Sequence, residues 1–396
     1  MAYIPPHKRH SKGLDRPSPT PEMLAPQFKR TLNLRSSGSK VDSVPKLFYA
    51  NNAISRWCIV GLNDGNQFPS SVHLQPSSAE PVDKKTGEKP LMLVNSHVLE
   101  GDDEVQANVS IRLWVSIAEI VWPDLLTSFE IVKNEMERQE LVAVKPSLVA
   151  RIGKILFKGT PSVSLGTVKK FPVAESTMKQ LKRSFCTNVP SSYVESLIDE
   201  VATKIGVELD KDIYHIKLAD STQPDSTIAC KCVVKEDKKL NLLKASIELN
   251  PLRNMALDIS CLDKNLDLRL MLCTKRSLTD LTDDEMHSIK TLINQAVLDP
   301  DVKGGLRWSL GKASSGDRYS VVGVWHTIVT IYESPSLRLK VRHADRFDFR
   351  TATGEVTKEI ILKLKGVLSK LQEEVDRNSI TDMLKDNLKL IWNHFL

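Results

Sequence analysis

Long apolar runs are missing from this sequence of 396 residues. A secretory signal needs about 7–15 consecutive apolar residues, and a membrane-spanning helix needs about 20. The opening residues MAYIPPHKRH break any such run with Pro5, Pro6, Lys8 and Arg9. We therefore expect no membrane association and a location in the cytoplasm, the nucleus or both.

Cysteine is also scarce, with six residues that lie mostly inside apolar stretches. This usage predicts buried, reduced thiols and no disulfide framework. Cys230 and Cys232 are two residues apart and would share one face of a strand, where two thiolates can bind a soft metal. No Cys-x-x-Cys or His pair accompanies them. The sequence therefore favours packed core thiols, with no metal or other cofactor.

Catalytic motifs are absent as well. The chain has no G-x-S-x-G elbow, no H-E-x-x-H and no dinucleotide fingerprint. The stretch GGLRWSLGKAS is similar to a phosphate loop, but Gly305 and Gly311 are one residue too far apart. In addition, Ala313 stands where a phosphate loop needs a hydroxyl group for magnesium. We predict no catalytic residues, although an enzyme whose site residues are scattered in sequence stays open.

The positive charge is concentrated at the start of the chain. Of the 55 basic and 49 acidic residues, nine basic and three acidic ones lie in residues 1–46, which leaves 46 of each sign in the other 350 residues. Prolines at 17, 19, 21 and 26 and the scarcity of apolar residues predict a disordered arm over residues 1–45. The arm is either a solubilising tail or a docking arm for an anionic partner such as RNA. The candidate RNA contacts are Lys8, Arg9, Lys12, Arg16, Lys29 and Arg30.

The rest of the chain has the pattern of an α+β protein with mainly antiparallel sheets packed by helices. We expect a smaller subdomain over 46–165 and a larger one over 166–396, with an antiparallel meander and two C-terminal helices. In the smaller subdomain, the expected strands are 55–62, 70–75, 91–94 and 108–117, and the expected helices are 122–139 and 145–159. In the larger one, the expected helices are 178–185, 192–209, 283–298, 357–375 and 379–396, and the expected strands are 212–220, 227–237, 242–250, 255–263, 266–273, 318–332 and 337–349.

Three local patterns carry most of this assignment. Apolar residues alternate strictly from Val109 to Ile117, which predicts a half-buried strand. In 145–159 an apolar stripe is opposed by Arg151, Lys154 and Lys158, which predicts a helix with a basic face and a second place for RNA to bind. Thr282 followed three residues later by Glu285 predicts a capping box.

The opening string MAYIPPHKRHSK, continued by RPSPTPEMLAPQFKR, resembles the start of a family of plant proteins with a domain of unknown function. The resemblance covers the whole chain. It implies a plant source, an intracellular protein, a disordered basic start and an α+β body, and it brings no activity or site residues.

The shorter string Tyr3-Ile4-Pro5-Pro6-His7 resembles a segment near the start of some DEAD-box RNA helicases. In that family the segment is associated with binding the cap-binding translation factor, and a leucine follows the tyrosine by five residues. Lys8 stands at that position here, and the helicase ATPase motifs are missing. The resemblance implies an RNA-linked environment and marks Tyr3 as a contact for a protein partner.

These observations favour a non-enzymatic adaptor that associates with RNA or RNA–protein complexes through its arm. The alternative is an enzyme with a site in the cleft between the two subdomains. A third class, a structural partner in a larger complex, would leave an exposed apolar stripe on the last helix, with Trp392 and Phe395 as anchors.

If the arm binds RNA, replacing Lys8 and Arg9 together by alanine should flatten the log–log salt dependence of RNA affinity by about one to two units. Each phosphate contact on a single strand contributes about 0.7 to that slope. Fluorescence titration of a single-stranded RNA at several salt concentrations measures the effect. An unchanged slope would remove the arm as the RNA contact.

Overall fold

The computed structural model describes residues 48–60, 71–77, 87–95, 113–138, 143–160, 165, 175–223, 226–278, 281–308, 318–373 and 375–396. The predicted arm, with Tyr3 and all six candidate RNA contacts, lies outside the described residues. Residues Pro45–Leu396 form one compact unit. The expected division near residue 165 is not confirmed, because the strand before it pairs with strands that follow it.

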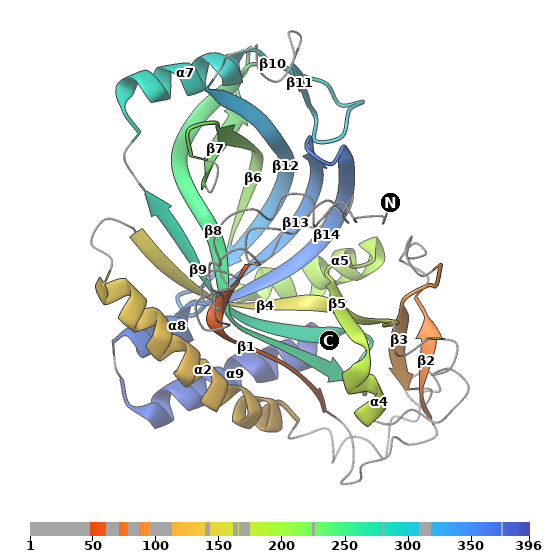
Figure 1. Ribbon diagram of the computed structural model, residues 1–396. Helices are drawn as coiled ribbons and strands as arrows, with labels where there is room; N and C mark the ends of the chain where they lie inside the picture. Colours follow the sequence, from red (N-terminus) through yellow and green to blue (C-terminus); the bar gives the residue numbers. More distant parts are fainter. Residues whose placement is uncertain are drawn as a thin grey trace, which may run out of the picture. The chain divides into compact units, whose positions relative to one another are not determined.

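The structure is mostly antiparallel sheet with a few helices (Figure 1). The strands of the large sheet are β1 (Phe48–Val60), β2 (Val72–Pro76), β3 (Leu91–Asn95), β4 (Ala143–Lys158), β5 (Lys182–Cys186), β6 (Val207–Asp220), β7 (Ser226–Val234), β8 (Leu240–Cys261), β9 (Asp267–Leu278), β12 (Tyr319–Glu333), β13 (Leu337–Asp348) and β14 (Thr353–Leu364). A separate hairpin contains β10 (Ala296–Leu298) and β11 (Leu306–Trp308). The helical segments are α2 (Leu113–Arg138), α4 (Glu175–Gln180), α5 (Ser191–Leu197), η4 (Ile198–Ala202), α6 (Thr203–Ile205), α7 (Asp283–Asn294), α8 (Lys365–Gln372) and α9 (Arg377–His394).

Eight strands of the large sheet close into a ring. The order of paired strands around the ring is β4, β9, β8, β7, β6, β12, β13 and β14. The last strand, β14, pairs with β4 and closes the ring. Every pair in this ring is antiparallel. The closing pair is short and joins Ile361 to Arg151, Leu362 to Ala150 and Lys363 to Val149. Because side chains alternate along a strand, each ring strand has one face inside the ring and one outside.

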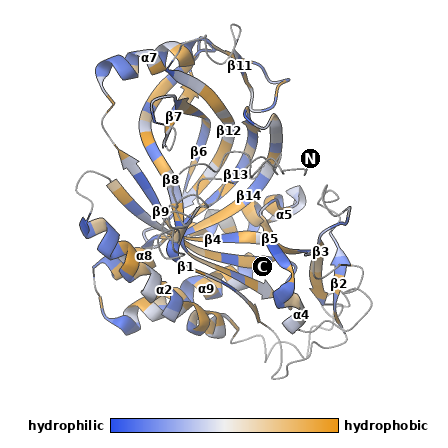
Figure 2. Cartoon of the chain, viewed as in Figure 1, coloured by the Kyte–Doolittle hydropathy of each residue, from blue (hydrophilic) through white to orange (hydrophobic). Residues whose placement is uncertain are grey.

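The outer face carries the hydrophobic core. On β4, Leu148, Ala150 and Ile152 join the main core cluster, in which α2, α8 and α9 pack against the strands. A second cluster lies where α7 and the β10–β11 hairpin cover β6, β7 and β12, and it contains both Cys230 and Cys232. Figure 2 shows the resulting alternation of hydrophobic and hydrophilic bands along the ring strands. The prediction that these two thiols are buried is confirmed, and burial raises the pKa of each.

Many expected elements are confirmed, including the strands in 212–237 and 318–349 and the C-terminal helix. The capping box is present as predicted, since the Glu285 amide donates to the Thr282 hydroxyl and the Thr282 amide donates to the Glu285 carboxylate. The last helix begins at Arg377, and its cap lies three residues before the predicted Ser379 cap. Its cap is Asp376, whose carboxylate accepts hydrogen bonds from the amides of Asn378 and Ser379.

Two predicted helices are wrong because their apolar residues fit a strand equally well. Residues 143–158 form β4, and residues 353–364 form β14, so that only Lys365–Gln372 of the predicted helix 357–375 is helical. In β14, Ile360, Leu362 and Leu364 face the core by strict alternation. Ladder partners on both sides of β4, which no local pattern reveals, decide in favour of the strand.

The reverse error occurs in the predicted strand 108–117. Helix α2 begins at Leu113, and its buried Ile117 and Val121 are four residues apart, while Val109 and Ile111 lie outside the described residues. Pro123, expected in the first turn, lies inside this helix, where Thr127 Oγ1 donates to its carbonyl at 2.9 Å. Other differences are β5 in place of the end of helix 178–185, and a single strand β8 in place of two. The predicted helices 283–298 and 192–209 also end early, because β10 begins at Ala296 and β6 at Val207.

The predicted exposed stripe on the last helix is also wrong. Trp392 is 2% exposed and Phe395 is fully buried, and both belong to the main core cluster. The Tyr193 hydroxyl also donates to the Phe395 carbonyl at 2.8 Å, which ties the end of the chain to α5. These two side chains therefore stabilise the fold and are not available as surface anchors.

We expect Trp392→Ala to lower the free energy of unfolding by about 3–5 kcal/mol, because it leaves a large cavity in the core. Chemical denaturation followed by circular dichroism measures the change. Asn393→Ala is the matched control, since Asn393 is exposed on the same helix and its replacement should stay within about 0.5 kcal/mol. Equal effects of the two substitutions would contradict the assignment of Trp392 to the core.

Candidate anion-binding site

The inner face of the strand ring is rich in cations. On β13, Leu337, Leu339 and Val341 face the core, so the alternate residues of this stretch face inward. Cross-strand partners continue this face from strand to strand around the ring. Ten of the inward-facing basic residues are Arg151 on β4, Lys211 and Lys217 on β6, Lys231 on β7, Lys275 on β9, Arg338, Lys340, Arg342 and Arg346 on β13, and Lys363 on β14; we call these ten the ring cations.

Charges on strands that are not neighbours act on one another across this interior. Burial lowers the pKa of Lys217 on β6, and Lys275 on β9 lowers it further, while Glu248 on β8 raises it. Burial likewise lowers the pKa of Lys363 on β14, with a contribution from Lys275. The side chains of four strands therefore share one interior space.

Glu359 on β14 is the central anion of the ring. Its side chain is 1% exposed, and it pairs with Arg342 and, at 2.5 Å, with Arg346. It also accepts hydrogen bonds from the hydroxyl groups of Thr357 at 3.3 Å and Thr187 at 3.4 Å. Burial opposes its ionisation, but the charges of Arg342, Arg346 and Arg151 outweigh burial and lower its pKa to about 2. Glu359 is thus ionised at neutral pH.

Several guanidinium nitrogens of the ring have no hydrogen-bond partner among the residues that the structure describes. The Nε atoms of Arg151, Arg338 and Arg342 are buried without a hydrogen bond to any described residue. Burial lowers the pKa of Arg151 to about 10; the charges of Arg342 and Arg253 add to this effect and that of Glu359 opposes it. A buried donor without a partner costs free energy, and a charged one costs more. These donors are therefore available to an acceptor that does not belong to the described residues.

The ammonium groups of Lys340 and Lys363 add to the excess of positive charge inside the ring. Burial lowers the pKa of Lys340 to about 8, and the charges of Lys363, Arg338, Arg342 and Lys211 lower it further. Neither ammonium has an ion-pair partner among the described residues. Like charges that crowd together in this way favour the binding of an anion, which relieves their repulsion.

Solvent reaches this interior. His215 on β6 is exposed, yet the surrounding protein and the charges of Lys231 and Arg342 lower its pKa to about 4. The side chain of Lys275 is 55% exposed although it pairs with Glu248. Exposure together with a strong influence of the surrounding protein is typical of a water-filled recess.

The predicted basic face of Arg151, Lys154 and Lys158 does not exist as a helix face, because all three lie on strand β4. Arg151 belongs to the ring interior. The Lys154 ammonium lies 3.9 Å from the carboxylate of Asp267, a buried residue that also accepts from the amides of Ile155 and Cys261. Burial raises the pKa of Asp267, and its contacts indicate a structural role.

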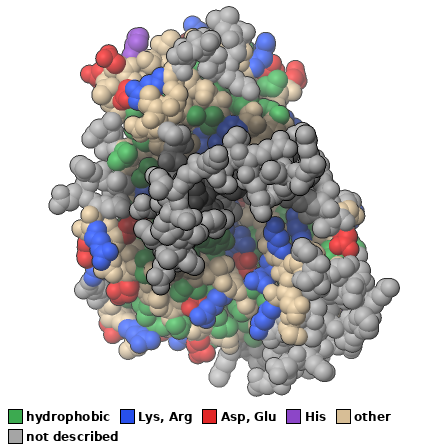
Figure 3. All heavy atoms as spheres, viewed as in Figure 1, with side chains coloured by type: hydrophobic (Ala, Val, Ile, Leu, Met, Phe, Trp, Pro, Cys, Tyr) green, Lys and Arg blue, Asp and Glu red, His purple; other side chains and the backbone are tan. Residues whose placement is uncertain are grey.

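The ring cations were missed by sequence reasoning, apart from Arg151. The signal was present in LRLKVR, residues 337–342, where cations alternate with aliphatic residues. This pattern is typical of a strand with one solvated face. Only closure of the ring turns that face inward. Figure 3 shows that Lys and Arg side chains also gather to the right of centre on the molecular face in view, close to β5 in Figure 1.

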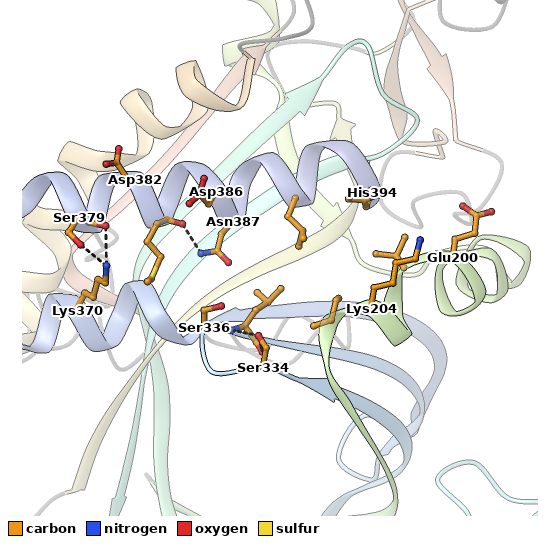
Figure 4. Close-up of a pocket in the computed structure, with 15 residues that line it drawn as sticks. Glu200, Lys204, Ser334, Ser336, Lys370, Ser379, Asp382, Asp386, Asn387 and His394 are labelled. Carbon is orange, nitrogen blue, oxygen red and sulfur yellow. Dashed lines mark hydrogen bonds between the residues drawn. The ribbon is translucent and has the colours of Figure 1, made fainter.

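A groove of about 560 Å³ lies outside the ring, between α9, α6 and the β12–β13 turn. Its charged residues are spread along it, with Lys370 bonded to Ser379 Oγ at 2.6 Å, and Glu200 and Lys204 at the other end (Figure 4). Its lining lies entirely in 200–394, within the expected larger subdomain. A smaller cavity of about 160 Å³ does join residues from both expected subdomains, among them Lys154 and Asp267. The alternative of an enzyme with a site between subdomains stays a prediction.

None of the described helices is long and apolar enough to cross a membrane. Within the same residues, no group of three or more His, Cys, Asp or Glu side chains is placed to hold a metal ion.

The fold and the site define the class of the protein as an antiparallel strand ring with a cationic interior. The family described as "Domain of unknown function (DUF7903)" matches residues 41–395, so the chain belongs to this family. The plant source stays a prediction. No curated protein matches the sequence.

Solved structures with some similarity include the Pct1 RNA triphosphatase of S. pombe in complex with the Spt5 CTD, at 10% identity and a TM-score of 0.40, with 68% of this chain and 94% of that chain covered. The same enzyme alone is 11% identical with a TM-score of 0.37, and the match covers 67% of this chain and 88% of that chain. The RNA triphosphatase domain of a mimivirus mRNA capping enzyme is 9% identical with a TM-score of 0.27, and the match covers 65% of this chain and 96% of that chain. Scores at this level establish neither a shared fold nor a shared activity.

The low pKa of Glu359 predicts a pH dependence of stability. Its pKa is about 2 in the folded chain, against an ordinary value of 4.5, so its contribution is complete above about pH 5 and is lost as the pH falls towards 2. The contribution is about 3 kcal/mol. Glu359→Gln should lower the free energy of unfolding at pH 7 and reduce its further loss between pH 5 and pH 3, as denaturant titrations at both pH values would measure.

Glu355→Gln is the control for this measurement, because Glu355 is exposed on the same strand. It should keep the pH profile of the wild type. A wild-type profile for Glu359→Gln as well would show that Glu359 does not stabilise the ring through its charge.

Proposed function

We propose that the chain is a binding protein for a ligand with several adjoining phosphate groups, which it holds inside the strand ring. The observation that carries this proposal is the set of buried arginine Nε donors without partners, on Arg151, Arg338 and Arg342. Around them, the ring cations outnumber the inward carboxylates. A phosphate chain supplies both the negative charge and the acceptor oxygens that these groups lack.

The type of cation supports phosphate over a simple halide or a single carboxylate. Arginine presents a planar fork of donors that matches phosphate oxygens, and lysine adds a compact charge. Arg151 and Lys363 lie on adjoining strands at the closing pair of the ring, and Lys340 lies on the next strand. Cations on three adjoining strands can contact successive phosphates of one chain.

Two inward carboxylates, Glu359 and Glu248, are already paired with cations, and this favours binding over phosphate hydrolysis. Glu359 is held by two arginines and Glu248 by Lys275. A carboxylate that is already paired in this way is a poor ligand for an activating cation and a poor general base. This supports the non-enzymatic class of the expected adaptor. It also adds a phosphate site in the body to the RNA contacts expected in the arm.

The test is isothermal titration calorimetry of the full chain with inorganic tripolyphosphate, in about 50 mM salt, where phosphate contacts are strong. We expect binding that weakens as salt is added. Arg151→Gln should weaken binding about tenfold or more, because a hydrogen bond to a charged group contributes about 1.5–3 kcal/mol. Glu359→Gln should strengthen it, since it removes the anion that competes for Arg342 and Arg346.

Lys385→Gln is the control for charge alone, because Lys385 lies on α9, outside the ring, and is 36% exposed. It should leave tripolyphosphate affinity unchanged. A 5′-triphosphorylated RNA as the second titrant distinguishes free polyphosphate from an RNA end as the source of the phosphates. Absence of tripolyphosphate binding, or an equal loss with Lys385→Gln, would overturn the proposal. Release of inorganic phosphate that Arg151→Gln abolishes would favour the enzyme alternative.

A further inference from the structure

Trp325 is an aromatic residue on the inner face of the ring. On β12 it is paired with His215 of β6 on one side and with Arg346 of β13 on the other. Both of these neighbours face inward, and the indole is half-buried. The main cores lie on the outer face of the strands and do not include Trp325. Its ring is therefore part of the wall of the cationic interior.

The indole lies along its own strand. A Cβ atom at Gly323, two residues away, would be 3.5 Å from the edge of the indole, so the absence of a side chain at Gly323 leaves room for this orientation. The Lys217 ammonium lies over the ring, 4.7 Å from its centroid. A flat aromatic surface with a cation beside it can accept the face of another planar ring in place of the cation.

Trp325 is also at a suitable distance from the phosphate-binding cations. It lies opposite Arg346, whose backbone is four residues from that of Arg342 on β13, or about 13 Å at roughly 3.3 Å per residue. The guanidinium groups of both arginines reach the Glu359 carboxylate, so they lie together within the span of an extended nucleoside triphosphate that starts at Trp325. A ligand with its terminal phosphates near Arg342 and Arg151 would bring its base to Trp325.

We propose that Trp325 stacks on a nucleobase and makes the ring interior selective for nucleoside polyphosphates over inorganic polyphosphate. The inference rests on the proposed phosphate site and adds the identity of the group that carries the phosphates. Lys217 moves from the indole to the phosphates when the base stacks. The base face is read without hydrogen bonds, so all four common bases are accepted.

The experiment compares ATP with inorganic tripolyphosphate by calorimetry on the full chain without added metal. Stacking of one base on an aromatic side chain corresponds to roughly a tenfold preference for ATP. Trp325→Phe and Trp325→Leu form a matched pair, because both keep an apolar side chain and only Phe keeps an aromatic face. The Phe variant should retain most of the preference for ATP, and the Leu variant should bind ATP no more tightly than tripolyphosphate.

Trp114→Leu is the control, because Trp114 lies on α2, outside the ring, and also has a lysine over its indole, Lys389 at 5.7 Å. It should change neither affinity. A preference for ATP that persists in Trp325→Leu, or a wild-type chain with equal affinity for both ligands, would overturn the role of Trp325 while the phosphate site stands. If neither ligand binds to the wild-type chain, both the proposal of a phosphate site and the inference about Trp325 are overturned.

Discussion

The short pairing of β4 with β14 is the constraint on which the rest of the structure depends. Three residue pairs close the strand ring, and they place Arg151 beside Ile361, two residues from Glu359. Closure removes the free edges that an open sheet of these strands would have. It also gives every ring strand an inner face, and thereby converts ordinary solvated lysines and arginines into one enclosed group of charges.

Enclosure has an electrostatic cost, because charges that leave bulk water lose solvation and repel one another at short range. The chain offsets part of this cost with Glu359, which is buried and lies between Arg342 and Arg346. Burial still lowers the pKa of Arg151 and Lys340, and their cationic neighbours lower it further, so the compensation is incomplete. A structure with more cations than anions in one recess is most stable when a ligand supplies the missing charge.

Local patterns in the sequence predicted many elements, although the strict alternation from Val109 to Ile117 predicted a strand where helix α2 begins at Leu113. The alternation in 318–349 and the capping box at Thr282 were predicted in this way, and both are present. The apolar residues of 145–159 and 357–364 satisfy a helix as well as a strand, and only long-range ladder partners decide between them. The site was harder to predict for the same reason. Arg151, Arg342 and Lys363 are far apart in sequence, and their proximity follows from ring closure, which no single segment contains.

The net charge of the body does not reveal the ring cations. The body has equal numbers of acidic and basic residues after residue 46, which pointed to the arm as the basic part of the chain. Equal totals, however, do not fix how the charges are distributed in space. On β13, Arg338, Lys340 and Arg342 share the inner face, whereas many acidic residues, such as Asp212 and Asp382, are exposed. Because electrostatic attraction at short range depends on nearby charges, a neutral body can hold a strongly cationic recess. Sorting of charges between the two faces of a closed sheet, and not their sum, therefore determines where the proposed phosphate site lies.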